Sequence, residues 1–146
     1  MRRALLLGLV VLVVVGVGAI YRAFRIDIVA ARDRTIGRSE VVETSFGTVE
    51  YAVDGEGPPV LAIHGSGGGF DQALDFIAPL AGGGFRTIVP SRFGYLRSSM
   101  PENATPAMQA DAFAELLDRL GLTEPVLVFG GSAGALSAIE FAIRHP

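Results

Sequence analysis

The sequence predicts an α/β fold that follows one transmembrane helix, and three observations carry this prediction. Residues 4–21 form an uncharged run of 18 at the N-terminus. Residues 41–53 form two β-rich runs divided by Gly47, which is typical of an antiparallel hairpin. From residue 60 onward, short apolar runs alternate with helical periodicity, as in a parallel sheet with right-handed crossover helices. At 146 residues the chain has room for about one domain.

The composition excludes several classes of function. There is no Cys, so disulfides, thiolate zinc sites, iron–sulfur clusters and a Cys nucleophile are ruled out. All 12 basic residues are Arg, which removes the Lys of a Walker A loop and of a pyridoxal Schiff base. With 2 His, a histidine metal site has few ligands, and we expect neither metal nor cofactor. A net charge of -3 and a pI near 5.3 argue against a nucleic-acid partner.

The N-terminal segment, residues 1–21, is predicted to be a membrane anchor. At about 1.5 Å per residue the uncharged run spans roughly 27 Å, close to the hydrocarbon thickness of a bilayer. The alternative is a cleaved signal peptide with Val17, Gly18 and Ala19 as the processing site, which would leave a secreted protein. Signal cores usually run about 7–15 residues, so the length of this run favours an uncleaved single-pass anchor.

Residues 22–40 are predicted to be a basic juxtamembrane linker. Their five arginines are Arg22, Arg25, Arg32, Arg34 and Arg38. This surplus favours a cytoplasmic C-terminal side, but a three-residue N-terminal tail is a poor test of the positive-inside rule, so the side stays undecided. Beyond residue 38, 5 Arg stand against 13 Asp and Glu. The linker would suit anionic headgroups or simply be solvated, and it leads into an acidic globular part over residues 41–146.

Five strands are predicted in the globular part. They are Val41–Phe46, Thr48–Val53, Val60–Ile63, Thr87–Val89 and Val126–Phe129. Gly and Pro mark the turn over residues 54–59, and Pro90 stops the fourth strand. The third strand is a continuous apolar run of the length expected for a buried strand, and the fourth is also expected to be buried.

Three helices are predicted between and after these strands. The first covers residues 71–80 and is closed by the glycines at 82–84. The second has Thr105 as N-cap and Pro106 as its first residue, carries an apolar face through Leu120, and ends at Gly121. The third follows Gly134 and runs to the end of the sequence.

The turn between the fifth strand and the third helix carries the candidate nucleophile, Ser132. Gly130 to Gly134 match G-x-S-x-G, and a Ser on a sharp strand-to-helix turn exposes its Oγ above the sheet. Gly130 and Gly134 let the backbone pass close to its neighbours. The Ala133 amide lies at a helix N-terminus, where it can donate to a developing oxyanion. The alternative is a Gly-rich turn with an incidental Ser.

Two further loops follow strand ends. In the first, His64 to Gly69, a dinucleotide fingerprint is disfavoured because the third residue after Gly67 is Phe70. This loop can place a backbone N–H opposite Ser132, and we expect His64 to be hydrogen-bonded beneath it rather than to act as a base. The second loop, residues 90–99, is expected to be one wall of a substrate cleft or a surface turn.

The order of these motifs over residues 41–146 resembles the N-terminal half of an α/β-hydrolase. The resemblance implies that Ser132 is the nucleophile and that the N–H groups of Ser66 and Ala133 form the oxyanion hole. It also implies hydrolysis of an ester or related acyl bond in a small-molecule substrate through an acyl-enzyme, without cofactor. Dehalogenase-like and epoxide-hydrolase-like members would carry Asp at position 132. Carbon–carbon bond hydrolases share the first loop but usually have Asn where this chain has Gly131, and they stay an alternative.

The sequence departs from this family in one respect. In the family the triad acid and His lie well beyond the nucleophile, whereas here 14 residues follow Ser132. His145 lies along the helix from Ser132, at roughly 20 Å by the helical rise, too far for a proton transfer. We therefore expect the 146-residue chain to be incomplete and inactive alone, with an exposed apolar edge at the fifth strand. A non-catalytic binding or scaffold module is the alternative.

Overall fold

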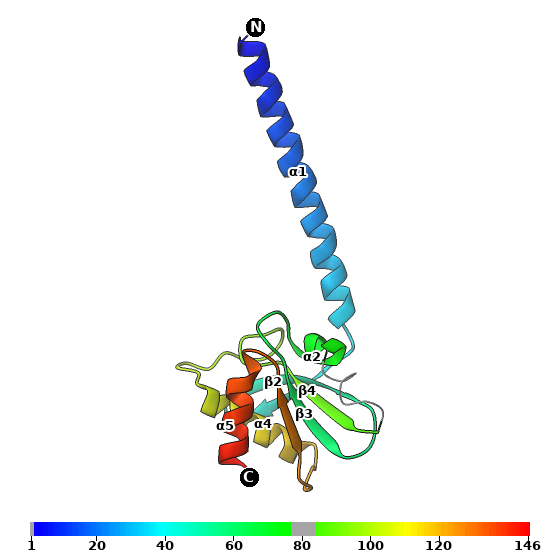
Figure 1. Cartoon of the computed structure of the whole chain (residues 1–146), viewed down its shortest axis with the longest axis vertical. Helices are drawn as coiled ribbons and strands as arrows, with labels where there is room; N and C mark the ends of the chain where they lie inside the picture. The colour runs from blue at the N-terminus through cyan, green and yellow to red at the C-terminus, as the bar shows by residue number, and fades with distance from the viewer. Residues whose placement is uncertain (1, 77–83) are drawn as a thin grey trace. The chain divides into compact units, whose positions relative to one another are not determined.

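The computed structural model describes residues 2–76 and 84–146, and the chain divides into two units, Met1–Ile36 and Gly37–Pro146 (Figure 1). The end of the first predicted globular helix, with the glycines at 82 and 83, lies outside the described residues.

The first unit is one long helix, α1 (Arg2–Thr35). It contains the predicted anchor and continues for more than three turns into the segment predicted as a linker. This segment contains no Pro, and its last turn carries Arg32 and Arg34, whose charges complement the negative end of the helix dipole. Gly37, at φ +73°, follows the helix. The basic segment is therefore largely helical, and its role as a linker stays a prediction.

Helix α1 is long and apolar enough to cross a membrane. Its most apolar 18-residue window has a mean hydropathy of 2.8, and none of that window is buried against the rest of the chain. An N-terminal signal sequence meets the same criteria, so the helix is consistent with both alternatives drawn from the sequence.

Carbonate extraction of membranes, followed by N-terminal sequencing, decides between these alternatives. We expect the chain to stay in the membrane pellet with its N-terminus intact, because the apolar run is longer than an ordinary signal core. A soluble product that starts near Ile20 would instead show that the segment is removed.

The second unit is built on a five-stranded sheet in the order β1-β2-β4-β3-β5. Its strands are β1 (Glu40–Thr44), β2 (Gly47–Asp54), β3 (Pro59–Ile63), β4 (Arg86–Pro90) and β5 (Leu127–Gly130). The pairs β1–β2 and β2–β4 are antiparallel, whereas β3 pairs in parallel with β4 and β5. The predicted hairpin and parallel sheet are both confirmed.

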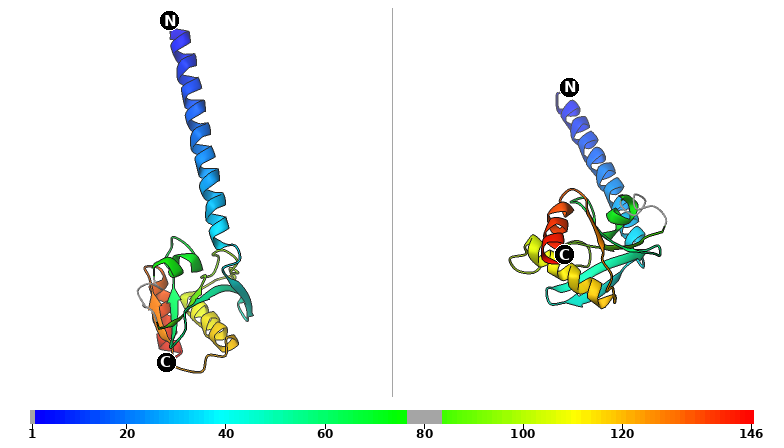
Figure 2. Two further views of the ribbon diagram at one scale, coloured as in Figure 1. Left: turned by 90° about the vertical axis from the view of Figure 1, so that its right-hand side faces the viewer. Right: turned by 60° about the horizontal axis from the view of Figure 1, so that its bottom comes forward.

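Helices cover both faces of this sheet (Figure 2). Helices α4 (Pro106–Arg119) and α5 (Gly134–Arg144) pack on one face, where Leu61 and Ile63 of β3 join Phe113 and Phe141 in the core. The short helix α2 (Phe70–Phe76) packs on the other face, against Ala62. Alternate residues of β3 thus serve opposite layers, as the two-residue period of a strand requires.

The ends of α4 follow the signals in the sequence. The Thr105 side chain accepts a hydrogen bond from the Met108 N–H at 3.1 Å, and Pro106 is the first helical residue. After the helix, Gly121 has φ +69° and its N–H donates to the Asp118 carbonyl, while the Leu122 N–H donates to the Leu117 carbonyl. These two bonds form a Schellman motif, which places the loop before β5.

Strand β5 is an edge among the described strands, since it pairs with β3 alone. Large apolar side chains are exposed on it and along one side of α5: Leu127, Phe129, Leu136, Ile139 and Ile143. This surface is the exposed apolar edge that the sequence led us to expect.

Candidate active site

Ser132 occupies a strained turn between β5 and α5. Its φ is +50°, a left-handed conformation that costs a non-glycine residue about 1–3 kcal/mol. The turn is held by three backbone hydrogen bonds, from Gly131 to Ile63 (2.9 Å), from Gly134 to Gly131 (2.8 Å) and from Ala135 to Ser132 (3.0 Å). A strained non-glycine residue held this firmly points to a functional position.

The glycines on either side of Ser132 leave no room for a side chain. A Cβ on Gly134 would lie 2.4 Å from the His64 carbonyl oxygen and 2.6 Å from that of Ile63. A Cβ on Gly130 would lie 2.7 Å from the Cβ of Ala138. Helix α5 therefore starts in direct backbone contact with the end of β3, which brings the Ser132 turn beside the loop that follows β3.

His64 is fully buried beneath that loop, and both of its ring nitrogens are engaged. Nε2 accepts a hydrogen bond from the Arg92 N–H at 2.8 Å, so the proton lies on Nδ1, which donates to the Gly65 carbonyl at 2.6 Å. Burial, and to a smaller extent the charge of Arg92, lowers the pKa of His64 to about 4. His64 is thus neutral and structural, as the sequence led us to expect.

The Gly65–Ser66 peptide is oriented by these contacts. The Gly65 carbonyl accepts from His64 Nδ1 and from Arg92 Nη2 at 3.1 Å. In a trans peptide the C=O and N–H groups point in opposite directions, so the Ser66 N–H points away from His64. Within residues 2–76 and 84–146, neither the Ser66 N–H nor the Ala133 N–H has a protein acceptor. Both donors are available for an anionic oxygen.

A cavity of about 460 Å³ joins the two loops. It is lined by His64, Gly65, Ser66, Gly67, Gln72, Phe76, Gly131 and Ser132. The structure therefore brings Ser66 and Ser132 together, while Ala133 contributes the peptide nitrogen next to Ser132 without lining the cavity. Gln72 and Phe76 were missed from the sequence, because neither belongs to a loop motif and both line the cavity only through the position of α2.

A family model for the alpha/beta hydrolase fold matches residues 58–146. This match covers more than half of the chain and includes every residue of the cavity. The chain belongs to the alpha/beta hydrolase fold family.

Known hydrolases support this assignment. The uncharacterized hydrolase YcgS of Bacillus subtilis is 37% identical over 109 residues, which are 75% of this chain and 38% of the relative. An alpha/beta hydrolase fold protein from Nakamurella multipartita is 40% identical with a TM-score of 0.65, over 74% of this chain and 37% of that one. The structure of the N-acyl homoserine lactonase AidH with N-butanoyl homoserine is 30% identical with a TM-score of 0.61, covering 74% and 41%. The chain thus spans less than half the length of these relatives.

The loop after β4 contacts the two loops that carry Ser66 and Ser132. The Arg92 guanidinium donates to the Gly65 carbonyl and, at 3.4 Å, to the Ala133 carbonyl, and it lies 5.0 Å from the Tyr95 ring centre. The Tyr95 hydroxyl donates to the Ser66 carbonyl at 3.3 Å. Residues 90–99 do not line the described cavity beside Ser132, so our expectation of a cleft wall is corrected. Arg92 is long enough to reach both loops, which local sequence patterns do not reveal.

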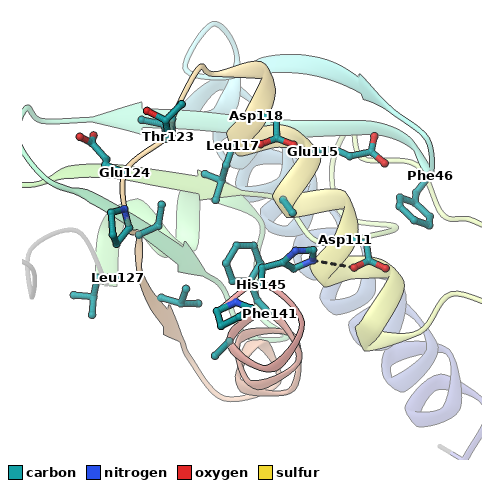
Figure 3. Close-up of a pocket in the computed structure, with 17 residues that line it drawn as sticks. Phe46, Asp111, Glu115, Leu117, Asp118, Thr123, Glu124, Leu127, Phe141 and His145 are labelled. Atoms are coloured by element: carbon teal, nitrogen blue, oxygen red, sulfur yellow. Dashed lines mark hydrogen bonds and ion pairs between the residues drawn. The ribbon is translucent and has the colours of Figure 1, made fainter.

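His145 lies at the opposite end of α5 from Ser132. Its Nε2 is 2.9 Å from Asp111 Oδ1, within a separate cavity of about 880 Å³ beside α4 and β5 (Figure 3). Arg144 bonds the same carboxylate, and chiefly this bond lowers the pKa of Asp111. His145 therefore does not face Ser132, and His64 has no free lone pair, so neither histidine of the chain is placed as its base.

The low pKa of His64 predicts an acid-sensitive fold. Below about pH 6.5 the unfolded chain protonates His64, whereas the folded chain does so only near pH 4. The free energy of unfolding should therefore fall as the pH drops from about 6.5 to 4, by up to about 3 kcal/mol. Urea unfolding of the full chain at several pH values measures this slope.

The matched controls for this acid sensitivity are single substitutions at the two histidines. We expect His145→Gln to retain most of the slope, because it leaves the buried His64 ring in place. His64→Asn should remove it, since the buried titrating ring is gone. A slope that persists in His64→Asn contradicts the assignment.

Proposed function

We propose that this chain carries the nucleophile and oxyanion hole of a serine hydrolase that cleaves esters or related acyl bonds through an acyl-enzyme. The observation that supports this best is the left-handed φ of +50° at Ser132, on a turn beside two backbone N–H groups that have no protein acceptor among the described residues. A strained serine next to oriented donors is the arrangement that acyl transfer needs.

In the proposed reaction, Ser132 Oγ attacks the acyl carbonyl carbon and loses its proton to a base. The negative charge that develops on the carbonyl oxygen is held by the N–H groups of Ser66 and Ala133. The carbonyl then re-forms as the C–O bond to the protonated leaving alcohol breaks, which leaves an ester on Ser132. Water attacks this acyl-enzyme in the same way and releases the carboxylic acid. No metal or redox group takes part in these steps.

The base in this scheme is neither His64 nor His145. His64 uses both nitrogens to orient the loop, and His145 is paired with Asp111 away from the site. We therefore propose that residues 1–146 alone do not turn over substrate. A non-catalytic binding module remains the competing function, and the experiment below separates the two.

We propose a small acyl compound as the substrate class, with lactones included. The cavity is small and combines Phe76 with backbone amides, which suits a short acyl chain and its carbonyl group. The lactonase among the structural relatives acts on a cyclic ester, which is chemistry of the same type. We also propose that α1 is retained and anchors the whole protein in a membrane.

Turnover of p-nitrophenyl butyrate tests the proposal in two proteins. One is the 146-residue chain, and the other is the same chain fused to the part of YcgS that follows the aligned region. We expect no Ser132-dependent turnover in the first and measurable turnover in the second, because the fusion restores a base to a competent nucleophile. Turnover by the chain alone that is lost in Ser132→Ala would show that a base is already within reach. A folded fusion without turnover would favour the binding module.

A further inference from the structure

Gln72 lies on α2 and reaches the loop that carries Ser66. Its Oε1 accepts a hydrogen bond from the Gly65 N–H at 2.8 Å. Because a backbone N–H needs an acceptor, this bond assigns the amide orientation and places the NH₂ group on the other side. Gln72 is therefore held in one orientation by the loop itself.

The NH₂ group of Gln72 is left for a ligand. Within the described part of the chain, Nε2 has no acceptor and is not among the buried atoms. It rests against Gly67, since a Cβ on that residue would lie 2.7 Å from Nε2. Both Gln72 and Gly67 line the cavity beside Ser132. An oriented donor without a partner, in a cavity this small, is ready to bind an oxygen.

Ser132 and Gln72 flank the same glycine. A Cβ on Gly65 would lie 3.2 Å from the Cβ of Ser132 and 3.4 Å from Gln72 Oε1. Because Gly65 has no side chain, the Gln72 amide and the Ser132 side chain both lie directly against it. Gln72 and Ser132 both line the cavity of about 460 Å³, so a substrate bound at Ser132 shares that cavity with the amide.

We propose that Gln72 is a substrate-binding residue whose Nε2 donates a hydrogen bond to an oxygen of the acyl substrate held beside Ser132. This inference rests on the proposed function of the Ser132 site. It makes the site selective for compounds with a strong oxygen acceptor, such as an ester or lactone carbonyl, over apolar compounds of the same size. An ether oxygen is a weaker acceptor and should be held less well.

The chain offers a direct test, because it contains two glutamines, Gln72 and Gln109. Gln109 is buried, and its Oε1 accepts from the Phe93 N–H outside the cavity, so it serves as an internal control. The full chain, labelled with ¹⁵N-glutamine in dodecyl maltoside, is titrated with ethyl butyrate and, separately, with butyl ethyl ether. Binding itself is followed on the ligand by saturation transfer, independently of any protein signal.

We expect ethyl butyrate to shift the Gln72 NH₂ signals saturably and to leave those of Gln109 in place. Butyl ethyl ether should produce a much smaller shift. Ester binding that leaves Gln72 unmoved would overturn the inference while leaving the role of Ser132 intact. A complete absence of ester binding would also overturn it, and serine labelling then decides the proposed function separately.

Gln72→Glu provides a matched variant. It keeps an acceptor for the Gly65 N–H and loses the donor, so the loop should stay folded while ester binding weakens roughly threefold to tenfold. Gln72→Met removes both groups and should additionally lower the thermal stability of the chain. Equal ester affinity in Gln72→Glu and the unchanged chain would overturn the inference, and the ¹⁵N titration decides it if either variant fails to fold.

Discussion

Ser132→Ala is expected to abolish covalent labelling by a fluorophosphonate in the fusion protein described above. The probe reacts with a serine whose hydroxyl is exposed and activated, and Ser132 lies on the strained turn beside the N–H groups of Ser66 and Ala133, which have no acceptor within residues 2–76 and 84–146. The loss should be complete, because no other side-chain atom replaces Oγ. Mass spectrometry of the labelled peptide checks the site directly.

Ser66→Ala is the matched control for this labelling. Ser66 is proposed to act through its backbone N–H, which Ala retains, so most of the labelling should remain. Removing an oxyanion donor outright typically costs about 10²–10³ in rate. A loss of that size in Ser66→Ala would show that its hydroxyl is the donor, and labelling that survives Ser132→Ala would remove the proposed nucleophile.

Gly134→Ala is expected to lower the free energy of unfolding of the globular unit by about 3 kcal/mol or more. Losses of this size are typical of severe steric conflicts in the core or backbone. The added Cβ would lie 2.4 Å and 2.6 Å from two backbone carbonyl oxygens of β3 and the loop that follows it. Backbone atoms cannot rotate away as a side chain can, so α5 must move. Thermal unfolding followed by circular dichroism measures the loss.

Gly18→Ala is the control for this steric argument. A Cβ at Gly18 meets no atom within 4 Å, and Ala is the better helix former, so the unfolding of the globular unit should be unchanged. Comparable melting of Gly134→Ala and the unchanged chain would mean that α5 does not start against β3 as described.

Local patterns in the sequence were enough for the elements and for the tight turn at Ser132. The β-rich runs around Gly47 form the hairpin, and Thr105, Pro106 and Gly121 delimit α4, because caps and turns depend on residues only a few positions apart. The Gly-x-Ser-x-Gly pattern likewise indicated a tight turn at Ser132, since its geometry depends on five consecutive residues. Helix α1 extends well past its predicted end at residue 21. The prediction followed the end of the uncharged run, but charged residues do not stop a helix, and α1 continues to Thr35.

Contacts between distant segments needed the tertiary structure. Gln72 and Phe76 enter the cavity only because α2 packs beside the loop after β3, and Arg92 supports that loop across 27 residues of sequence. The hydrogen bond from the Arg92 N–H to His64 Nε2 also joins distant segments, and it leaves His64 without a free nitrogen to act as a base. The sequence by itself determined the anchor-like helix, the order of strands and helices, and the serine on its turn, because each is encoded by residues that are neighbours in the chain. The tertiary structure alone decided which groups face Ser132, because hydrogen bonds and burial across the sheet depend on how the strands align in space.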